Sequence, residues 1–327
     1  MDDPPEGSEP PPKRPALHST QPRTVPLPEQ SPKSAHEDPT APDRVAAILA
    51  NQAHRPADRD PEFLSWDAMR GVRLDLDYEK AELILQAHRI GHTIIVFGST
   101  RTREPAAAAL AVRQAEEALA AAPGERVLQH RLRVARRRQH HSRYYGIARE
   151  FGRLVARESG RTPAGRIVVM TGGGPGIMEA ANRGASDAGA ETVGLNITLP
   201  HEQFPNPYVT PDLCFSFHYF AIRKLHFMRR ACALVAFPGG FGTLDELFET
   251  LTLIQTRKMP AVPVVLVGRE YWERVVHIDT MIEEGTIDAE DGEIFGYAET
   301  AAEAWQMIRH WHRAAGTPCF LDSVAAP

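Results

Sequence analysis

The chain has 327 residues, a length that suggests one large domain or two ordinary ones. Its charged fraction of 24% and apolar fraction of 43% are typical of a soluble globular protein, and the formal net charge of -5 gives no sign of a protein that binds nucleic acid or an anionic membrane. The chain has no apolar run long enough to span a bilayer, no secretory signal at its N-terminus and only three cysteines, so we expect a cytoplasmic protein without a membrane partner.

The N-terminal segment, residues 1–42, holds 12 of the 27 prolines together with many polar residues. Such a segment buries too little apolar surface to offset the entropy of ordering, so we predict that it is disordered. It serves either as a solubilising extension or as an interaction tail. We expect a single domain over residues 43–317, followed by a loose C-terminal tail over residues 318–327.

Helices are predicted before and after the first strand, as additions over residues 43–90 and 104–159. Their ranges are 43–52, 75–89, 104–122 and one long helix or two over 125–159. The last range carries a run of basic residues: Arg131, Arg133, Arg136, Arg137 and Arg138. Given the acidic balance of the whole chain, a solvated helix face or a subunit contact is favoured there over nucleic-acid binding.

Short apolar segments predict strands at 93–97, 166–171, 192–197, 213–217, 233–237 and 262–267. Helices are predicted at 177–189, 218–230, 243–257 and 271–284, and a closing helix at 300–315. Apolar strands that alternate with helices indicate a parallel sheet buried on both faces. The expected fold is therefore α/β, a Rossmann-like doubly wound sheet of about six or seven strands with additional N-terminal helices. Ligands bind such sheets at the carboxyl ends of the strands, where the strand order reverses.

Two of these strands lead directly into glycine-rich turns that precede helices. The first turn contains Gly172, Gly173, Gly174 and Gly176, and the second contains Gly239, Gly240 and Gly242. Glycine lets the backbone approach a ligand closely, and the free N–H groups of a helix N-terminus bind anions. We therefore predict that both loops hold one phosphate between them. Neither is a Walker loop, because Gly-Lys-Ser/Thr does not follow the glycines. The turn Gly98–Arg101, after the first strand, is placed to add further donors.

Two polar segments near the second glycine loop each have a structural and a functional interpretation. Thr243 and Glu246 fit a capping box at the start of a helix. Alternatively, Glu246 is an ionised carboxylate beside a bound phosphate and sugar, where it stabilises a developing cation or activates a water. The pair Arg223-Lys224 is either exposed or contributes an arginine that binds phosphate. The histidines lack metal-ligand spacing, so no metal site is predicted.

The segment Pro238–Glu246 resembles the P-G-G-x-G-T-x-x-E motif of the LOG (Lonely Guy) family, whose bacterial relatives are often labelled lysine decarboxylase-like. That family carries an Arg-Lys pair 15 residues before the motif proline, and Arg223 has this spacing from Pro238. The segment Gly172–Glu179 is similar to the first glycine block of the family. The resemblance covers about residues 93–267, and the long helical additions look like those of the longer bacterial members.

The resemblance implies a hydrolase that cleaves the N-glycosidic bond of nucleoside 5′-monophosphates, AMP or a cytokinin riboside monophosphate, to free base and ribose 5-phosphate. It places the catalytic pair at Arg223 and Glu246, and nucleotide contacts at Lys224, Gly239–Thr243 and Thr252. It implies no metal or organic cofactor, and a homo-oligomer, either a dimer or a hexamer.

Three other functions fit parts of the same pattern. A nucleotide-binding module without turnover would use the same loops. A pyridoxal-dependent lysine decarboxylase follows only from the family label, with Lys224 as its Schiff-base lysine. A dinucleotide oxidoreductase would need a glycine fingerprint and a ribose-binding acid that the sequence lacks. The preferred base of a nucleotide substrate stays open.

Overall fold

The computed structural model describes residues 31–158, 161–162, 165–198 and 204–317. The predicted disordered segment lies outside the described residues up to residue 30, and the predicted tail 318–327 lies outside them entirely. Contacts divide the chain into two compact units, up to Met69 and from Arg70 onward. The first unit contains α1 (Ala41–Ala50), which confirms the helix predicted at 43–52, and α2 (Pro61–Ser65), with three short 3-10 turns.

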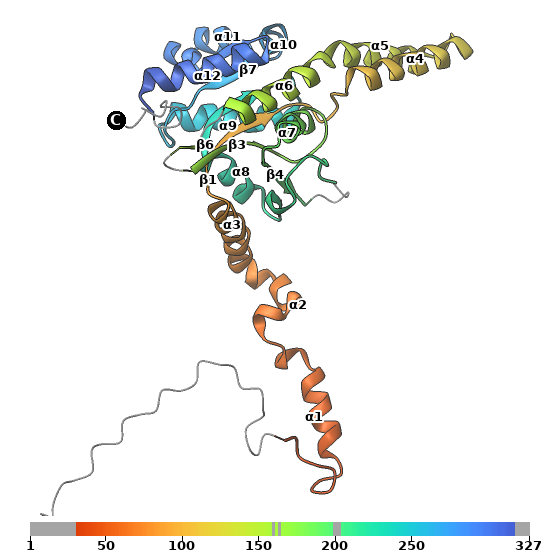
Figure 1. Cartoon of the computed structure of the whole chain (residues 1–327). Coiled ribbons are helices and arrows are strands. Elements are labelled where there is room, and N and C mark those ends of the chain that lie inside the picture. Colours follow the sequence, from red (N-terminus) through yellow and green to blue (C-terminus); the bar gives the residue numbers. More distant parts are fainter. Residues whose placement is uncertain (1–30, 159–160, 163–164, 199–203, 318–327) are drawn as a thin grey trace, which may run out of the picture. The chain divides into compact units, whose positions relative to one another are not determined.

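The second unit is built on one twisted sheet with β1 at its centre (Figure 1). Seven strands run parallel in the order β5-β4-β3-β1-β6-β7-β8, and the short β2 pairs antiparallel with β3. Their bounds are β1 (Ile90–Phe97), β2 (Arg161–Thr162), β3 (Gly165–Thr171), β4 (Thr192–Ile197), β5 (Cys214–Phe217), β6 (Ala231–Ala236), β7 (Val264–Val267) and β8 (Phe295–Ala298). The chain builds outward from β1 to β5 and then crosses to the other side of β1, so the strand order reverses between β1 and β6. The predicted Rossmann-like architecture is confirmed.

Helices cover both faces of this sheet because successive strand residues point to opposite sides. Ile94 and Val96 of β1 pack into a core with α6, α7 and α12, whereas Ile95 and Phe97 pack into a second core with α3, α8, α9 and α10. The helix bounds are α3 (Arg70–Ala87), α4 (Pro105–Ala121), α5 (Arg126–His141), α6 (Arg143–Glu158), α7 (Ile177–Asp187), α8 (Phe220–Arg229), α9 (Phe241–Gln255), α10 (Arg269–Val275), α11 (Ile278–Glu283) and α12 (Ala301–Ala315).

The short helix α2 and the two-residue strand β2 were not predicted, and the predictions differ from the structure in two further places. The range 271–284 forms two helices, because the chain is extended at Val276, between α10 and α11. The strand β8 was not predicted: Phe295–Ala298 contains a glycine and is only half-buried, so it lacks the apolar run that marks the other strands. The range 125–159 forms two helices, as the sequence allowed.

Helix α3 holds both ends of α8, the helix that carries Arg223. At the N-terminal end, the carboxylate of Asp77 accepts hydrogen bonds from the backbone N–H groups of His218 and Tyr219, at 2.8 and 2.9 Å. At the C-terminal end, the buried Glu82 pairs with Arg229 and Arg230 at 2.9 and 2.7 Å. Hydrogen bonds, chiefly from Arg230, hold the pKa of Glu82 at about 2. These contacts fix the direction from which α8 meets the sheet.

In the part of the chain that the structure describes, no helix is both long and apolar enough to cross a bilayer.

Candidate functional site

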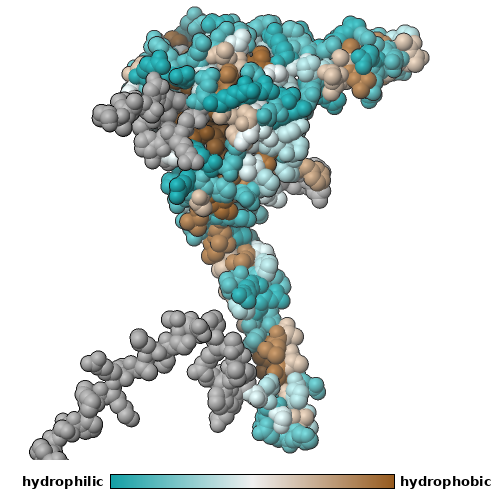
Figure 2. Space-filling view, in the orientation of Figure 1, coloured by the Kyte–Doolittle hydropathy of each residue, from teal (hydrophilic) through white to brown (hydrophobic). Residues whose placement is uncertain are grey.

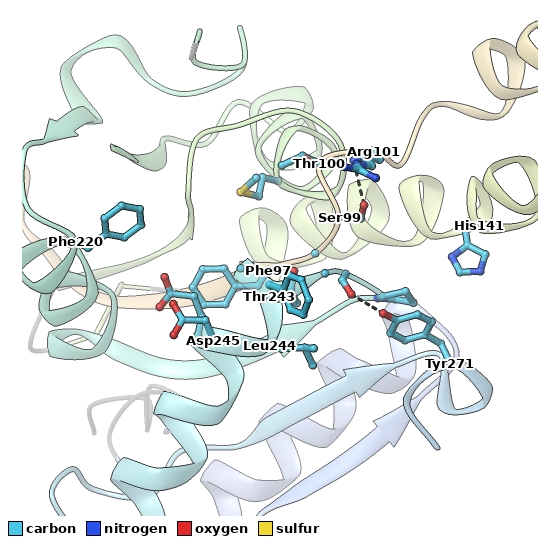
Figure 3. A pocket seen from close by; sticks show the side chains of 18 of the residues that line it. Phe97, Ser99, Thr100, Arg101, His141, Phe220, Thr243, Leu244, Asp245 and Tyr271 are labelled. Atoms are coloured by element: carbon cyan, nitrogen blue, oxygen red, sulfur yellow. Dashed lines mark hydrogen bonds between the residues drawn. The ribbon is translucent and has the colours of Figure 1, made fainter. Parts of the chain in front are cut away.

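A cavity of about 780 Å³ opens at the carboxyl ends of β1 and β6, where the strand order reverses. Its volume is within the range of small-molecule sites, and its position is the one at which doubly wound sheets bind ligands. The lining comes from the turn after β1, the start of α8, the loop between β6 and α9, and single residues of other elements: Phe97–Arg101, Phe220, Arg223, Pro238–Glu246, Met178, His141 and Tyr271. Figure 3 shows most of these side chains around the opening.

The loop after β6 presents bare backbone to the cavity. A Cβ atom on Gly239 would lie 2.1 Å from the hydroxyl oxygen of Thr243, so only glycine fits there. Helix α9 starts at Phe241, with Gly240 as its N-cap and without a side-chain cap. Within the described residues, the N–H groups of Gly240, Phe241 and Gly242 make no hydrogen bond. Free N–H groups at a helix N-terminus are suited to binding a phosphate.

The predicted capping box is wrong. Thr243 is the third residue of α9 rather than its cap, because the chain already turns at Gly239 and Gly240. Glu246 therefore lies in the second turn, and its side chain is buried at 4% exposure in the lining of the cavity. Of the two interpretations of Glu246, the structure supports the one in which the carboxyl group faces a site.

Arg223 and Glu246 meet in the cavity wall, with 3.4 Å between Nη1 of the arginine and Oε1 of the glutamate. The arginine is held from other sides as well. Its Nε donates to the carbonyl oxygen of Leu195 in β4, at 2.6 Å, and its guanidinium lies 4.9 Å from the ring centroid of Phe227. The position of Arg223 thus depends on the sheet and on α8 more than on Glu246.

Burial dominates the electrostatics of this pair. Loss of solvent raises the pKa of Glu246 to about 7, although Arg223 and Lys224 act in the opposite direction. Burial likewise lowers the pKa of Arg223. In the described structure, Oε2 of Glu246 is buried and has no hydrogen-bond partner. The sequence predicted an ionised carboxylate stabilised by the helix dipole. The structure instead gives a carboxyl group that gains or loses its proton near neutral pH, in the second turn where the dipole is weak.

The first glycine block lies behind Arg223 and is absent from the lining of the cavity. A Cβ atom on Gly172 would lie 2.6 Å from Nη2 of Arg223, and one on Gly176 would lie 2.3 Å from the carbonyl oxygen of Ser99. Gly173 has a φ of +71°, which favours glycine. The N-terminus of α7 is already occupied, because the N–H of Ile177 donates to Ser99. Gly172, Gly173, Gly174 and Gly176 are all buried. This placement fits a role in positioning the arginine and the turn after β1, and not the predicted direct grip on a phosphate.

Two further predicted contacts lie outside the lining of the cavity. Lys224 pairs with Asp245 and Glu249 at 2.8 and 3.2 Å. Burial acts to lower the pKa of Lys224, but these two carboxylates raise it overall, so the amine stays charged and is unsuited to a Schiff base. Thr252 is exposed on α9, and its hydroxyl donates to the carbonyl oxygen of Phe248 at 2.7 Å.

His141 and Tyr271 line the cavity although no sequence pattern pointed to them. The hydroxyl of Tyr271 donates to the carbonyl oxygen of Gly239 at 2.5 Å, which fixes the glycine loop. The rings of His141 and Tyr271 are 6.0 Å apart. Tyr271 follows closely after a strand, so the rule that sites form at strand ends was a signal for it, whereas His141 ends a helix far from any motif.

A metal centre is not evident in the described structure, since no group of three or more His, Cys, Asp or Glu side chains is arranged to hold a metal ion. Of the histidines, His201 lies outside the described residues. His226 is buried between the rings of Tyr78 and Phe217, at 5.1 and 5.4 Å, as a packed core residue.

Residues 178–308 match the protein family described as "Possible lysine decarboxylase". This range contains Arg223 and the whole Pro238–Glu246 segment. The first glycine block, Gly172–Gly176, precedes it.

Curated plant proteins are similar to part of the chain. The chain is 31% identical over 139 residues to the probable cytokinin riboside 5′-monophosphate phosphoribohydrolase LOGL5 of Oryza sativa subsp. japonica, a match that covers 42% of this chain and 55% of that protein. It is 30% identical over 148 residues to the cytokinin riboside 5′-monophosphate phosphoribohydrolase LOG3 of Arabidopsis thaliana, a match that covers 44% of this chain and 67% of that protein. The chain therefore spans little more than half the length of the first of these relatives.

Solved structures are more distantly similar. The Moco carrier protein from Chlamydomonas reinhardtii is 18% identical, with a TM-score of 0.39 and a match that covers 68% of this chain and 98% of that one.

The Arg223–Glu246 pair and the glycine loop before α9 thus come together at one cavity, and both lie within the residues that match the family model. The chain belongs to the LOG family.

Proposed function

We propose that the chain is a hydrolase that cleaves the N-glycosidic bond of nucleoside 5′-monophosphates and releases free base and ribose 5-phosphate. AMP and cytokinin riboside 5′-monophosphates are the proposed substrates, in line with the names of the plant relatives. The observation that carries the proposal is Glu246: a buried carboxyl group with a pKa of about 7 and a free oxygen, one helical turn from a phosphate-binding loop.

In this proposal, the glycine loop fixes the substrate. The free N–H groups of Gly240, Phe241 and Gly242 bind the 5′-phosphate at the N-terminus of α9. A phosphate held there places the ribose against the wall formed by Arg223 and Glu246. Fixing one end of the substrate lowers the entropic part of the barrier, because the anomeric carbon is then held near the carboxyl group.

The reaction needs a group that takes a proton from water and returns it to the leaving base. N-glycoside cleavage passes through a state with positive charge on the sugar, as in glycoside hydrolysis generally. Glu246 in its ionised form stabilises this charge and accepts the proton of the attacking water. With a pKa of about 7, the same group can then give that proton to the departing base. Arg223 keeps the carboxyl group in place and stays charged throughout.

The test is release of free base from AMP and from isopentenyladenosine monophosphate by the purified full chain, followed by chromatography. Glu246→Gln should lower the rate by about 10²–10⁴, the range expected for loss of a general acid–base group. Arg223→Ala should lower it strongly as well. Glu249→Gln is the matched control, since this carboxylate is on the same helix, pairs with Lys224 and does not line the cavity.

Near-wild-type base release by both Glu246→Gln and Arg223→Ala would remove these residue roles. Tight AMP binding without any base release would instead make the chain a nucleotide-binding module.

We also propose that the chain is a homo-oligomer, and light scattering on the same preparation distinguishes a dimer from a hexamer.

A further inference from the structure

A second cavity, of about 330 Å³, adjoins the first at the turn after β1. Ser99, Arg101 and His141 line both cavities. The remaining lining comes from one face of α5 and from the same turn: Thr102, His130, Arg133, Val134, Arg137 and Arg138. The proposed catalytic reaction uses none of these residues.

Four of the nine residues that line this second cavity are arginines and two are histidines, and burial with nearby positive charge lowers the pKa of His141. Positions 130, 133, 134, 137, 138 and 141 recur at helical spacing, so the basic side chains share one face of α5. No carboxylate lines the cavity, and within the described residues Arg101, Arg133, Arg137 and Arg138 form no ion pair. Like charges at this spacing are destabilising.

Arg136, next to Arg137 on α5, points away from the cavity. Arg136 turns to the facing helix α4 and pairs with Glu116 at 2.9 Å. A carboxylate on α4 is therefore within reach of one side of α5, whereas three of the six arginines of α5 face the cavity instead. The view in Figure 2 shows a largely hydrophilic surface on the α4–α5 hairpin. An uncompensated cationic face against a hollow is suited to an anionic ligand.

The cationic face is close to the glycine loop. Tyr271 donates to Gly239 of that loop, and the ring of Tyr271 lies 6.0 Å from the ring of His141, which belongs to the cationic cavity. In the view of Figure 3, His141 and Tyr271 lie at one end of the first cavity, whereas Phe220 and Asp245 lie at the other. A phosphate on the glycine loop would have the sugar on the Glu246 side and free space toward Arg101 and His141.

We propose that the second cavity is an anion subsite that takes the phosphate groups beyond the first, so that nucleoside 5′-diphosphates and triphosphates bind across both cavities. The proposal rests on the proposed function in one respect: the first phosphate lies on the glycine loop. Such ligands compete with AMP, because both need that loop. Their outer phosphates contact Arg133 and Arg137 of α5 and Arg101 of the turn after β1.

The experiment measures binding of AMP, ADP, ATP and inorganic triphosphate to the full chain by calorimetry, without divalent cations, so that the phosphates keep their charge. Charge-assisted hydrogen bonds to exposed arginines should make ADP bind about tenfold more tightly than AMP, and ATP at least as tightly as ADP. The double variant Arg133→Gln/Arg137→Gln should remove this preference and leave AMP binding unchanged.

The matched control is Arg126→Gln/Arg131→Gln, which removes the same charge from exposed residues of α5 that do not line the cavity. Equal effects of the two double variants would overturn the subsite, because general electrostatic attraction would then explain the affinity. Equal affinity of wild type for AMP and ADP would overturn it as well.

The two proposals fail in different ways. If AMP is hydrolysed but triphosphate does not bind, the proposed hydrolase activity is supported and the proposed anion subsite is wrong. If AMP is neither bound nor hydrolysed, but triphosphate binds in a manner that depends on Arg133 and Arg137, the anion site is supported and the proposed reaction is wrong.

Discussion

Glu246 is a carboxyl group whose proton affinity the fold has changed, and this change links its chemistry to stability. Burial raises its pKa to about 7, above the ordinary value of 4.5. Between these two pH values the folded chain keeps a proton that the unfolded chain has released. The contribution of Glu246 to the free energy of unfolding therefore falls as the pH rises through this window.

We expect the stability difference between Glu246→Gln and wild type to grow in favour of the variant as the pH rises. Between about pH 5 and pH 8 the difference should change by about 2–3 kcal/mol, because glutamine has no proton to lose. Urea unfolding of both proteins across this range measures it. Loss of the contact with Arg223 shifts the free energy of unfolding of the variant by a constant amount, so it does not affect how the difference changes with pH. A pH-independent difference would show that the carboxyl group titrates normally.

The sequence predicted some residues of the site and missed others, and each outcome has its own physical reason. Arg223, Glu246 and the glycines of the second loop could be found because motif and spacing carry them. His141 could not, since the ring reaches the cavity only through the packing of α5 against distant elements. The first glycine block was expected at the ligand because a glycine loop at a strand end usually binds anions. Its actual neighbours, Arg223 and Ser99, belong to segments that are distant from the glycine block in the sequence.

At the scale of elements, α6 and α7 cross in close contact through two glycines. A Cβ atom on Gly152 would lie 2.1 Å from the carbonyl oxygen of Ala181, and one on Gly184 would lie 1.8 Å from that of Arg149. The contact matters for the site because α7 follows directly on the loop that supports Arg223.

We expect Gly152→Ala to destabilise the protein by about 1–3 kcal/mol, because the added methyl group meets rigid backbone and the two helices must separate. The control is Gly146→Ala on the same helix, where the added carbon has no atom within 4 Å beyond its chain neighbours and the backbone of its own helix. That change should stabilise the protein by about 0.5–1 kcal/mol, since alanine favours a helix over glycine. Thermal unfolding of both variants checks the pair. Similar stabilities would mean that the crossing is looser than described.

The elements that the sequence predicted well are those buried on both faces. The strand β4 was predicted at its observed bounds, because a continuous apolar run between turn residues has few alternatives. The strand β8 at the sheet edge is half-buried and contains Gly296, so its pattern does not differ from that of a loop. Val276 interrupts the range 271–284 without a proline or glycine, so the end of α10 left no local signal.

At the scale of the whole molecule, all residues of the sheet, of both cores and of the cavity follow Arg70. The sequence predicted one domain over residues 43–317, whereas contacts divide the chain at Met69 and Arg70. The separate unit contains α1 and α2, whose residues are mostly exposed.

We expect a fragment that starts at Arg70 to fold and to keep its cooperative thermal unfolding, because it contains a complete sheet with helices on both faces. Its rate of base release from AMP should be within about threefold of that of the full chain. Circular dichroism and the chromatographic assay measure the two properties. A fragment that aggregates or melts without cooperativity would show that residues before Arg70 belong to the folding unit. That result would agree with the predicted single domain over residues 43–317.

The central place of β1 also affects how the protein is made. β1 is the first sheet strand to leave the ribosome, and it pairs with β3 on one side and β6 on the other. The partner β6 begins only at Ala231, so a nascent chain that has finished β5 still carries an open apolar edge along Ile94, Ile95 and Val96. Such an edge is a template for pairing with other chains. Translation pauses or premature termination between Phe217 and Ala231 should therefore produce aggregating products that chaperones must shield.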